Sequence, residues 1–277
     1  MLSPQVKELQ KIACKVRMGI IEGVYNAKSG HPGGSLSIAD LLTYLYFVKM
    51  KIDPQNPKME DRDRLVLSKG HCAPGLYSAL AQRGYFPVDE LKTLRHIGSR
   101  LQGHPDMKHT PGVDMTTGSL GLGISAACGI ALSGKIDRKT YRVYSILGDG
   151  EVEEGQVWEA AMFAAHYQLD NLCAFVDVNG LQIDGPTEKV MNSAPLCDKF
   201  RAFGWHTIDI DGHDFEQIAA ALQEAGQTVG QPTMILAKCV KGKGVSFMEN
   251  QVGWHGKAPK QEEYEQAVAE IKAAAGL

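Results

Sequence analysis

The sequence has no long hydrophobic segment, no paired cysteine motif and no large net charge. None of its apolar runs approaches the roughly 20 residues that a membrane-spanning helix needs, and its first residues do not read as a signal peptide. Its six cysteines are scattered without a C-x-x-C pair, which argues against a zinc site, a dithiol redox motif and a secreted disulfide framework. A net charge of −3 gives no reason to expect nucleic acid or a membrane as a partner. These absences favour a cytoplasmic protein with reduced thiols.

The chain also lacks a linker and an internal repeat. No Pro/Ser-rich segment divides its 277 residues, and strand and helix patterns alternate from end to end. A hydrophobic content of 44% is ample for a buried core. The alternation predicts a single α/β domain over residues 1–277, with a doubly wound, mostly parallel sheet and helices on both faces. Ligands of such sheets bind beyond the carboxyl ends of the strands.

The most informative stretch has the pattern strand, glycine turn, helix, strand, and it ends at Asn179. Residues 141–147 are apolar and β-branched enough for a buried strand, and a G-D-G turn around Asp149 follows. A helical pattern over 155–168 leads to a second apolar run at 172–178. Because parallel strands end at the same edge of a sheet, we expect Asp149 and Asn179 to meet there.

A carboxylate and an amide oxygen at one sheet edge suit a hard cation. Together they favour Mg²⁺ or Ca²⁺ and leave coordination positions open for phosphate and water. Backbone N–H groups at the glycine turn and the helix start add donors for the same phosphate. The G-D-G tripeptide alone is equally typical of an ordinary strand-to-helix turn, with Asn179 as a simple turn former.

Other loops predicted at the same edge carry histidines or runs of small residues. A lone loop histidine is usually solvated, but glycines beside it let the backbone approach a ligand closely. One such segment, 26–35, is expected to be a loop that leads into a helix at 38–50. The G-x-x-G-x-G spacing at 118–123 is weak evidence for a phosphate-binding loop. No acidic residue follows at the position that a dinucleotide-binding site requires. Residues 181–187 are also expected to be a loop.

Several motifs in this order resemble the amino-terminal, diphosphate-binding part of transketolase over essentially the whole chain. They are S-G-H-P-G-G at 29–34, S-K-G-H at 68–71, G-H-P at 103–105, T-T-G-S-L-G-L-G at 116–123, G-D-G at 148–150, N-G-L-Q-I-D-G at 179–185, K-G-K-G at 241–244 and W-H-G-K at 254–257. In this family the Asp of G-D-G, an Asn that follows the tripeptide after 28 intervening residues, and a nearby carbonyl hold the metal. The resemblance therefore assigns Asp149, Asn179 and the carbonyl of Leu181 to Mg²⁺ or Ca²⁺.

The resemblance also implies contacts with thiamine diphosphate and with a sugar. Cations and N–H donors would neutralise the diphosphate, while Leu181 and Ile183 would pack near the thiazolium ring. His31 and His104 would hydrogen-bond or shuttle protons to the hydroxyls and carbonyl oxygen of a ketose. The implied cofactor contacts are Lys69, His71, Gly118, Ser119, Leu120, Gly150, Asn179, Ile183, Lys241 and His255.

The implied reaction moves a two-carbon ketol unit from a ketose phosphate to an aldose phosphate. A complete transketolase is more than twice this length and adds pyrimidine-binding and C-terminal domains that the sequence does not contain. We therefore expect one component of a split enzyme, active only in an α₂β₂ assembly with a C-terminal transketolase subunit; a truncated piece is the alternative. Glu154 resembles the family's interface carboxylate, although the helix dipole alone also favours an acid there.

Two alternatives to a transketolase stay open. One is another thiamine enzyme, such as a 1-deoxyxylulose-5-phosphate synthase or a 2-oxo-acid dehydrogenase component; His31 and His104 favour a sugar donor over these. The other is a non-catalytic scaffold, against which the intact metal ligands argue. The sugar itself is also open, between the usual pentose phosphates and a different one, because the phosphate grip belongs to the absent domain.

Overall fold

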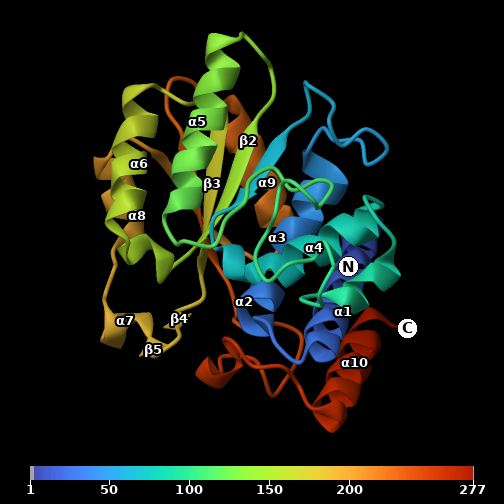
Figure 1. Ribbon diagram of the computed structural model, residues 1–277. Coiled ribbons are helices and arrows are strands. Elements are labelled where there is room, and N and C mark those ends of the chain that lie inside the picture. The colour runs from blue at the N-terminus through green and yellow to red at the C-terminus, as the bar shows by residue number, and fades with distance from the viewer. Residues whose placement is uncertain (1–2, 277) are drawn as a thin grey trace.

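Five parallel strands form the centre of the computed structural model, which describes residues 3–276 (Figure 1). Their order across the sheet is β1-β2-β3-β7-β6, and every neighbouring pair is parallel. This arrangement confirms the predicted doubly wound sheet. The strands are β1 Arg64–Leu67, β2 Val143–Gly148, β3 Leu172–Val178, β6 His206–Asp211 and β7 Thr233–Lys238.

Helices cover both faces of this sheet and bury alternate strand residues. In β2, Val143 and Leu147 pack into one apolar cluster, whereas Tyr144 and Ile146 pack into the other, as the two-residue period of a strand requires. The first cluster lies under α5 Leu122–Ile136, α6 Gly155–His166 and α8 Leu196–Ala202. The second lies under α1 Pro4–Ala27, α3 Ala39–Tyr44, α4 Ala73–Arg83 and α9 Phe215–Gln227, with α10 Gln261–Ala275 against α1.

The segment predicted as a glycine-rich loop at 26–35 is mostly helical. Helix α1 runs to Ala27, and the short helix α2 Pro32–Ser37 begins before the loop was expected to end. A proline suits the first turn of a helix, and the glycines allow close packing, since a Cβ on Gly33 would lie 2.8 Å from the Trp254 carbonyl oxygen. The prediction was wrong because the small residues serve helix packing as well as turns.

Two further segments differ from the sequence prediction. The helix expected at 38–50 ends as α3 at Tyr44, and a π-type turn, Leu45–Lys49, completes it. The loop expected at 181–187 contains a small antiparallel hairpin, β4 Leu181–Gln182 and β5 Gly185–Pro186, before helix α7 Thr187–Val190. Both pieces are too short to produce a periodic sequence pattern.

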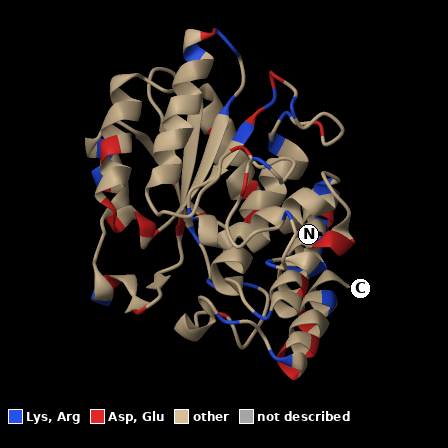
Figure 2. Cartoon of the chain, viewed as in Figure 1, with Lys and Arg blue, Asp and Glu red and all other residues tan. Residues whose placement is uncertain are grey.

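Residues of both charges are mixed along the outer helices and the loops (Figure 2). Among residues 3–276, no helix is both long and apolar enough to cross a membrane. Charged side chains inside the protein are few, and several of them gather near the carboxyl ends of β1, β2 and β3.

Candidate functional site

The G-D-G turn and the Asn179 turn lie side by side at the carboxyl edge of the sheet. Gly148, the last residue of β2, is in register with Asp177 of β3, so the residues that follow the two strands meet. Asp149 Oδ2 accepts a hydrogen bond from the Gly180 N–H at 2.5 Å, and Oδ1 accepts one from the Gly150 N–H at 3.0 Å. Asp149, Gly150 and Asn179 all line one cavity of about 600 Å³.

The orientation of the Asn179 amide is set by its neighbours. Its Nδ2 donates to Asp177 Oδ2 at 2.8 Å, and its Oδ1 accepts from the Leu181 N–H at 3.1 Å. The Leu181 carbonyl oxygen accepts from Lys241 Nζ at 3.0 Å. Asn179 and Leu181 line the same cavity as Asp149.

A buried ion pair lies beneath these groups. Lys69 Nζ donates to Asp177 Oδ2 at 2.5 Å and to the Gly34 carbonyl oxygen at 3.1 Å, and the Lys69 side chain is 2% exposed. Burial opposes the charge of Lys69, but the adjacent carboxylate raises the pKa of its ammonium group. Although Lys69 lies in the cavity wall, as predicted for a cofactor contact, its charge is already paired.

The surroundings of Asp149 disfavour the charged form of its carboxyl group. Burial, and next the nearby Asp177 carboxylate, raise its pKa to about 6. The backbone N–H groups of Gly180 and Gly150 lower it again, and so does Lys69, but they do not outweigh the rise. A cation beside this carboxylate would stabilise its charged form.

Three histidines from distant parts of the chain form a cluster at the cavity. The ring centroids lie 5.3 Å apart for His31 and His71, 5.5 Å for His31 and His255, and 5.2 Å for His71 and His255. Burial, followed by neighbouring cations, lowers the pKa of His31 to about 4 and that of His255 to about 3. Burial and Lys69 also bring the pKa of His71 well below its ordinary value. All three rings are neutral at pH 7.

Lys241 connects the cluster to the predicted metal site. Besides the Leu181 carbonyl, its Nζ contacts His255 Nδ1 at 2.9 Å. The loop that carries it is held close to α2, because the Gly242 N–H donates to the Gly33 carbonyl oxygen at 2.9 Å. Lys241 therefore reaches the cavity as a cation whose partners are neutral.

The remaining predicted residues fall into two groups. Gly118, Leu120 and Ile183 line the cavity. Ser119 and His104 are not among its lining residues. His104 packs against Gly118, since a Cβ on Gly118 would lie 3.2 Å from the His104 imidazole. Burial, and after it Arg95, lowers the pKa of His104.

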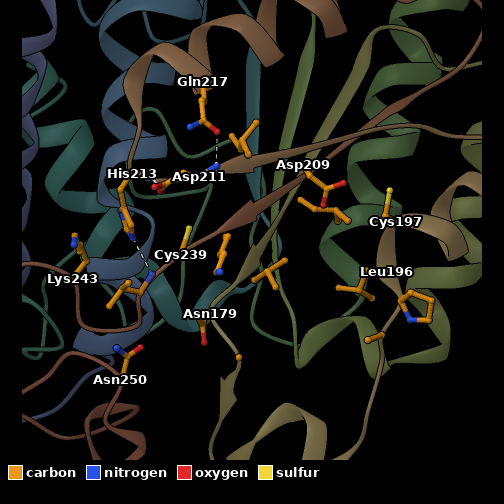
Figure 3. Close-up of a pocket in the computed structure, with 18 residues that line it drawn as sticks. Asn179, Leu196, Cys197, Asp209, Asp211, His213, Gln217, Cys239, Lys243 and Asn250 are labelled. Atoms are coloured by element: carbon orange, nitrogen blue, oxygen red, sulfur yellow. Dashed lines mark hydrogen bonds between the residues drawn. The ribbon is translucent and has the colours of Figure 1, made fainter. Parts of the chain in front are cut away.

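A larger cavity of about 1040 Å³ adjoins the first one (Figure 3). It lies at the ends of β6 and β7 and has a mostly apolar lining that includes Leu196, Ile210 and Leu236. It shares Asn179 with the smaller cavity but contains none of the other predicted site residues. The predicted chemistry therefore belongs to the smaller cavity.

Sequence reasoning missed the buried acids around the site. Asp177 accepts from Lys69, Asn179 and, at 2.6 Å, Ser37 Oγ. Glu151 accepts from donors in separate loops. A signal existed for Asp177, because a carboxylate inside an otherwise apolar strand needs a buried partner.

Comparisons with known proteins identify the family of the chain. Residues 9–277 match the family model described as "Transketolase, thiamine diphosphate binding domain". The chain is 50% identical over 271 residues to the 6-deoxy-6-sulfo-D-fructose transketolase subunit SqwG of Clostridium sp. (strain MSTE9), covering 98% of each chain. It is 42% identical to an apulose-4-phosphate transketolase subunit of Phocaeicola vulgatus, covering 96% of this chain and 95% of that one. The transketolase structure from Campylobacter jejuni superposes with a TM-score of 0.91 at 33% identity, and all of this chain covers 43% of it.

Proposed function

This chain belongs to the transketolase family, and we propose that it is one subunit of a split transketolase. In this proposal it supplies the diphosphate and metal side of the active site, and a second chain supplies the pyrimidine side. Two relatives of its own length are named as transketolase subunits, whereas it spans less than half of the transketolase from Campylobacter jejuni.

The observation that carries the proposal is the meeting of distant segments around one cavity. The cavity wall combines the G-D-G turn, the Asn179 turn, the S-K-G-H loop, the glycine turn at Gly118 and the loops of Lys241 and His255. The sequence singles out each of these segments independently of any contact between them. A chance arrangement would not bring the matching residue types to the same edge of the sheet.

Asp149, Asn179 and the Leu181 carbonyl are the proposed ligands of Mg²⁺, with Ca²⁺ as the alternative. All three donor atoms are oxygens, which these hard cations prefer. Because Asp177 holds the Nδ2 of Asn179 and the Leu181 N–H uses one lone pair of the Oδ1, the second lone pair of the Oδ1 is available to a cation. The raised pKa of Asp149, about 6, also fits, since a divalent ion would favour its charged form.

Lys241, His255, His71 and Lys69 are the proposed partners of the cofactor's diphosphate. Lys241 is the best placed of them, because the ammonium of Lys69 is paired with Asp177. The other proposed cofactor contacts are made by small or apolar residues of the cavity edge, namely Gly118, Ser119, Leu120, Gly150, Leu181 and Ile183.

Thiamine diphosphate would supply the nucleophilic carbon and the electron sink for breaking a carbon–carbon bond beside a carbonyl. His31 and His104 are proposed to hydrogen-bond the hydroxyls and carbonyl oxygen of the sugar and to move protons there. The lowered pKa values keep both rings neutral near pH 7, so each can donate at one nitrogen and accept at the other. His31 Nδ1 is buried without a partner among the described residues, which suits a group that awaits a ligand.

The proposed reaction is ketol transfer from a ketose phosphate, or a related anionic ketose, to an aldose phosphate in the cytoplasm. One relative is named for 6-deoxy-6-sulfo-D-fructose and another for apulose-4-phosphate, so the donor panel should include a sulfonated ketose as well as pentose phosphates. The proposed partner is a C-terminal transketolase subunit in an α₂β₂ assembly. Glu154, which lines the cavity, is the proposed carboxylate that links paired sites.

The test is reconstitution with a chain that carries the pyrimidine-binding domain. Ketol transfer should appear only when both chains, thiamine diphosphate and Mg²⁺ are present, and Asn179→Ala should abolish it. Full activity of this chain alone would overturn the partner requirement. Decarboxylation of a 2-oxo acid without ketol transfer would favour another thiamine enzyme instead.

A further inference from the structure

Glu151 is a buried acid that none of the predicted roles includes. It follows the G-D-G turn directly, is 2% exposed and lies in the cavity wall. Its carboxylate forms no ion pair within 4 Å among the described residues, and its partners are neutral hydrogen-bond donors. An acid buried in this way costs free energy unless its hydrogen bonds offset that cost, so its position calls for an explanation.

The donors come from separate loops that the proposed function uses for the cofactor. Glu151 Oε1 accepts from Ser68 Oγ at 2.6 Å and from the Gly121 N–H at 2.9 Å, and Oε2 accepts from the Gly148 N–H at 3.1 Å. Ser68 precedes Lys69 and His71, Gly121 follows the Gly118–Leu120 turn, and Gly148 opens the G-D-G turn. One carboxylate thus joins three segments that are far apart in the sequence.

The same segments approach one another too closely for ordinary side chains. A Cβ on Gly123 would lie 2.5 Å from Ser68 Cα, and a Cβ on Gly70 would lie 2.7 Å from the Gly118 nitrogen. Ser68 Oγ also accepts from the Ile124 N–H at 3.1 Å, at the first turn of α5. Close backbone approach and a shared acceptor together fix the spacing between the loops.

We propose that Glu151 is a positioning residue for the cofactor site, holding the Ser68–His71 loop, the Gly118–Gly121 turn and the G-D-G turn at the distances that diphosphate binding needs. Its role is exerted through the loops that it holds. The inference rests on the proposed function only for the identity of the ligand, because the link between the loops exists without one.

Glu151→Gln is the informative substitution, since it keeps the size and shape of the side chain. Both carboxylate oxygens accept from a backbone N–H. A glutamine amide has one oxygen and one NH₂ group, so it must set a donor against the N–H of either Gly121 or Gly148. Because one buried hydrogen bond is then left unmade, the loops should open about tenfold more often.

Asp114→Asn is the matched control. Asp114 also has a buried side chain, 4% exposed, and its Oδ2 accepts from the Leu65 N–H at 2.7 Å while it pairs with Arg62. Leu65 lies near the amino end of β1, away from the cavity. The control therefore neutralises another buried carboxylate, whose partners Arg62 and Leu65 lie outside the cofactor loops.

The first measurement is hydrogen exchange of the chain without cofactor. Glu151→Gln should accelerate exchange at Gly121 and Gly148 about tenfold relative to strand β3, whereas Asp114→Asn should not. Equal acceleration in both variants, or none in Glu151→Gln, would overturn the positioning role. If Glu151→Gln does not fold, Ser68→Ala carries the test, because it removes one donor and should loosen the turn at Gly121 by a smaller factor.

The second measurement is the Kd for thiamine diphosphate with Mg²⁺ in the complex with the partner chain. Glu151→Gln should raise it about tenfold, and Asp114→Asn should leave it unchanged. An unchanged Kd in Glu151→Gln would contradict the proposal. If the wild-type complex binds no thiamine diphosphate but the exchange pattern is as expected, the proposed function fails and the structural link stands.

Discussion

Two clusters of charged side chains in this chain are both buried, but positive charge balances negative charge in only one of them. At the carboxyl edge of β3, Asp177 and Asp149 share the nearby Lys69, and the pKa of Asp149 rises to about 6. Between α1 and α3, Asp40 contacts both Arg17 and His213, at 2.6 Å and 2.7 Å. Burial opposes the charge of Asp40 too, but Arg17 and then His213 lower its pKa to about 2.

Charge balance separates a candidate binding site from a structural ion cluster in this chain. The cluster around Asp40 is satisfied, and it holds nearby backbone: Arg17 Nε donates to the Lys243 carbonyl oxygen at 3.1 Å, and His213 Nε2 accepts from the Val240 N–H (Figure 3). The cluster around Asp149 has an excess of negative charge at an open cavity. A buried carboxylate with a raised pKa at an open cavity is typical of a functional site.

The largest effect is expected from Lys69→Met, which leaves Asp177 buried without its cation. Breaking such a pair costs about 3–5 kcal/mol of unfolding free energy, measurable by urea denaturation. Lys69 would no longer hold Asp177, which orients the Asn179 amide, so Mg²⁺-dependent binding of thiamine diphosphate should also weaken. Lys139→Met, at an exposed pair with Glu60, is the control and should change the free energy of unfolding much less, because solvent screens an exposed pair.

Arg17→Met tests the balanced cluster and should cost less, about 2–3 kcal/mol, because His213 still contacts Asp40. The Kd for thiamine diphosphate should change by no more than about threefold, because this cluster lies outside the cofactor cavity. Titration with thiamine diphosphate in the partner complex checks this. A loss of affinity as large as that in Lys69→Met would remove the distinction between the two clusters.

Asp149→Asn should have the opposite sign. A carboxyl whose folded pKa is raised destabilises the fold when it is charged, and a neutral amide removes that cost. The amide must also set its NH₂ group against the N–H of Gly150 or Gly180, so the net stabilisation of the metal-free chain at pH 7 should be only about 1 kcal/mol. The same change should abolish Mg²⁺-dependent cofactor binding, because a charged oxygen ligand is lost. Thermal unfolding with and without Mg²⁺ measures both effects, and a destabilised metal-free variant would contradict the unbalanced-charge account.

The histidine cluster predicts the smallest effect and a pH dependence. The folded pKa values of His31 and His255 lie near 4 and 3, below the unfolded value of about 6.5. The unfolded chain therefore binds more protons between about pH 4 and 6.5, and stability falls as pH is lowered through that range. From pH 7 to 5.5 the loss should be about 0.5 kcal/mol per histidine after solvent screening; His255→Asn should reduce this slope.

Much of the fold and of the candidate site followed from local patterns. Apolar runs and glycine turns predicted the strands on either side of Asp149, and the parallel arrangement then placed Asp149 near the Asn179 turn, as the structure confirms. The helical pattern predicted over 155–168 is found as α6 Gly155–His166. These features depend on residues close in sequence or on a general rule of sheet topology.

The rest depended on contacts between distant residues. Lys69 was predicted to face the diphosphate, but only the fold reveals that Asp177, 108 residues away, takes its charge. The link from Glu151 to Ser68 spans 83 residues and has no motif of its own. The helical state of residues 32–37 was missed because glycines usually signal turns, and their value here lies in packing against partners that the sequence does not reveal.

The shared acceptor at Glu151 bears on how this enzyme could be re-engineered. A chimera that imported the Gly118–Gly121 turn from a relative without its matching Ser68 and Glu151 segments would join parts shaped for different spacings. These segments should be exchanged between relatives as a set, and a library that shuffles them together should retain more working members than one that shuffles them singly.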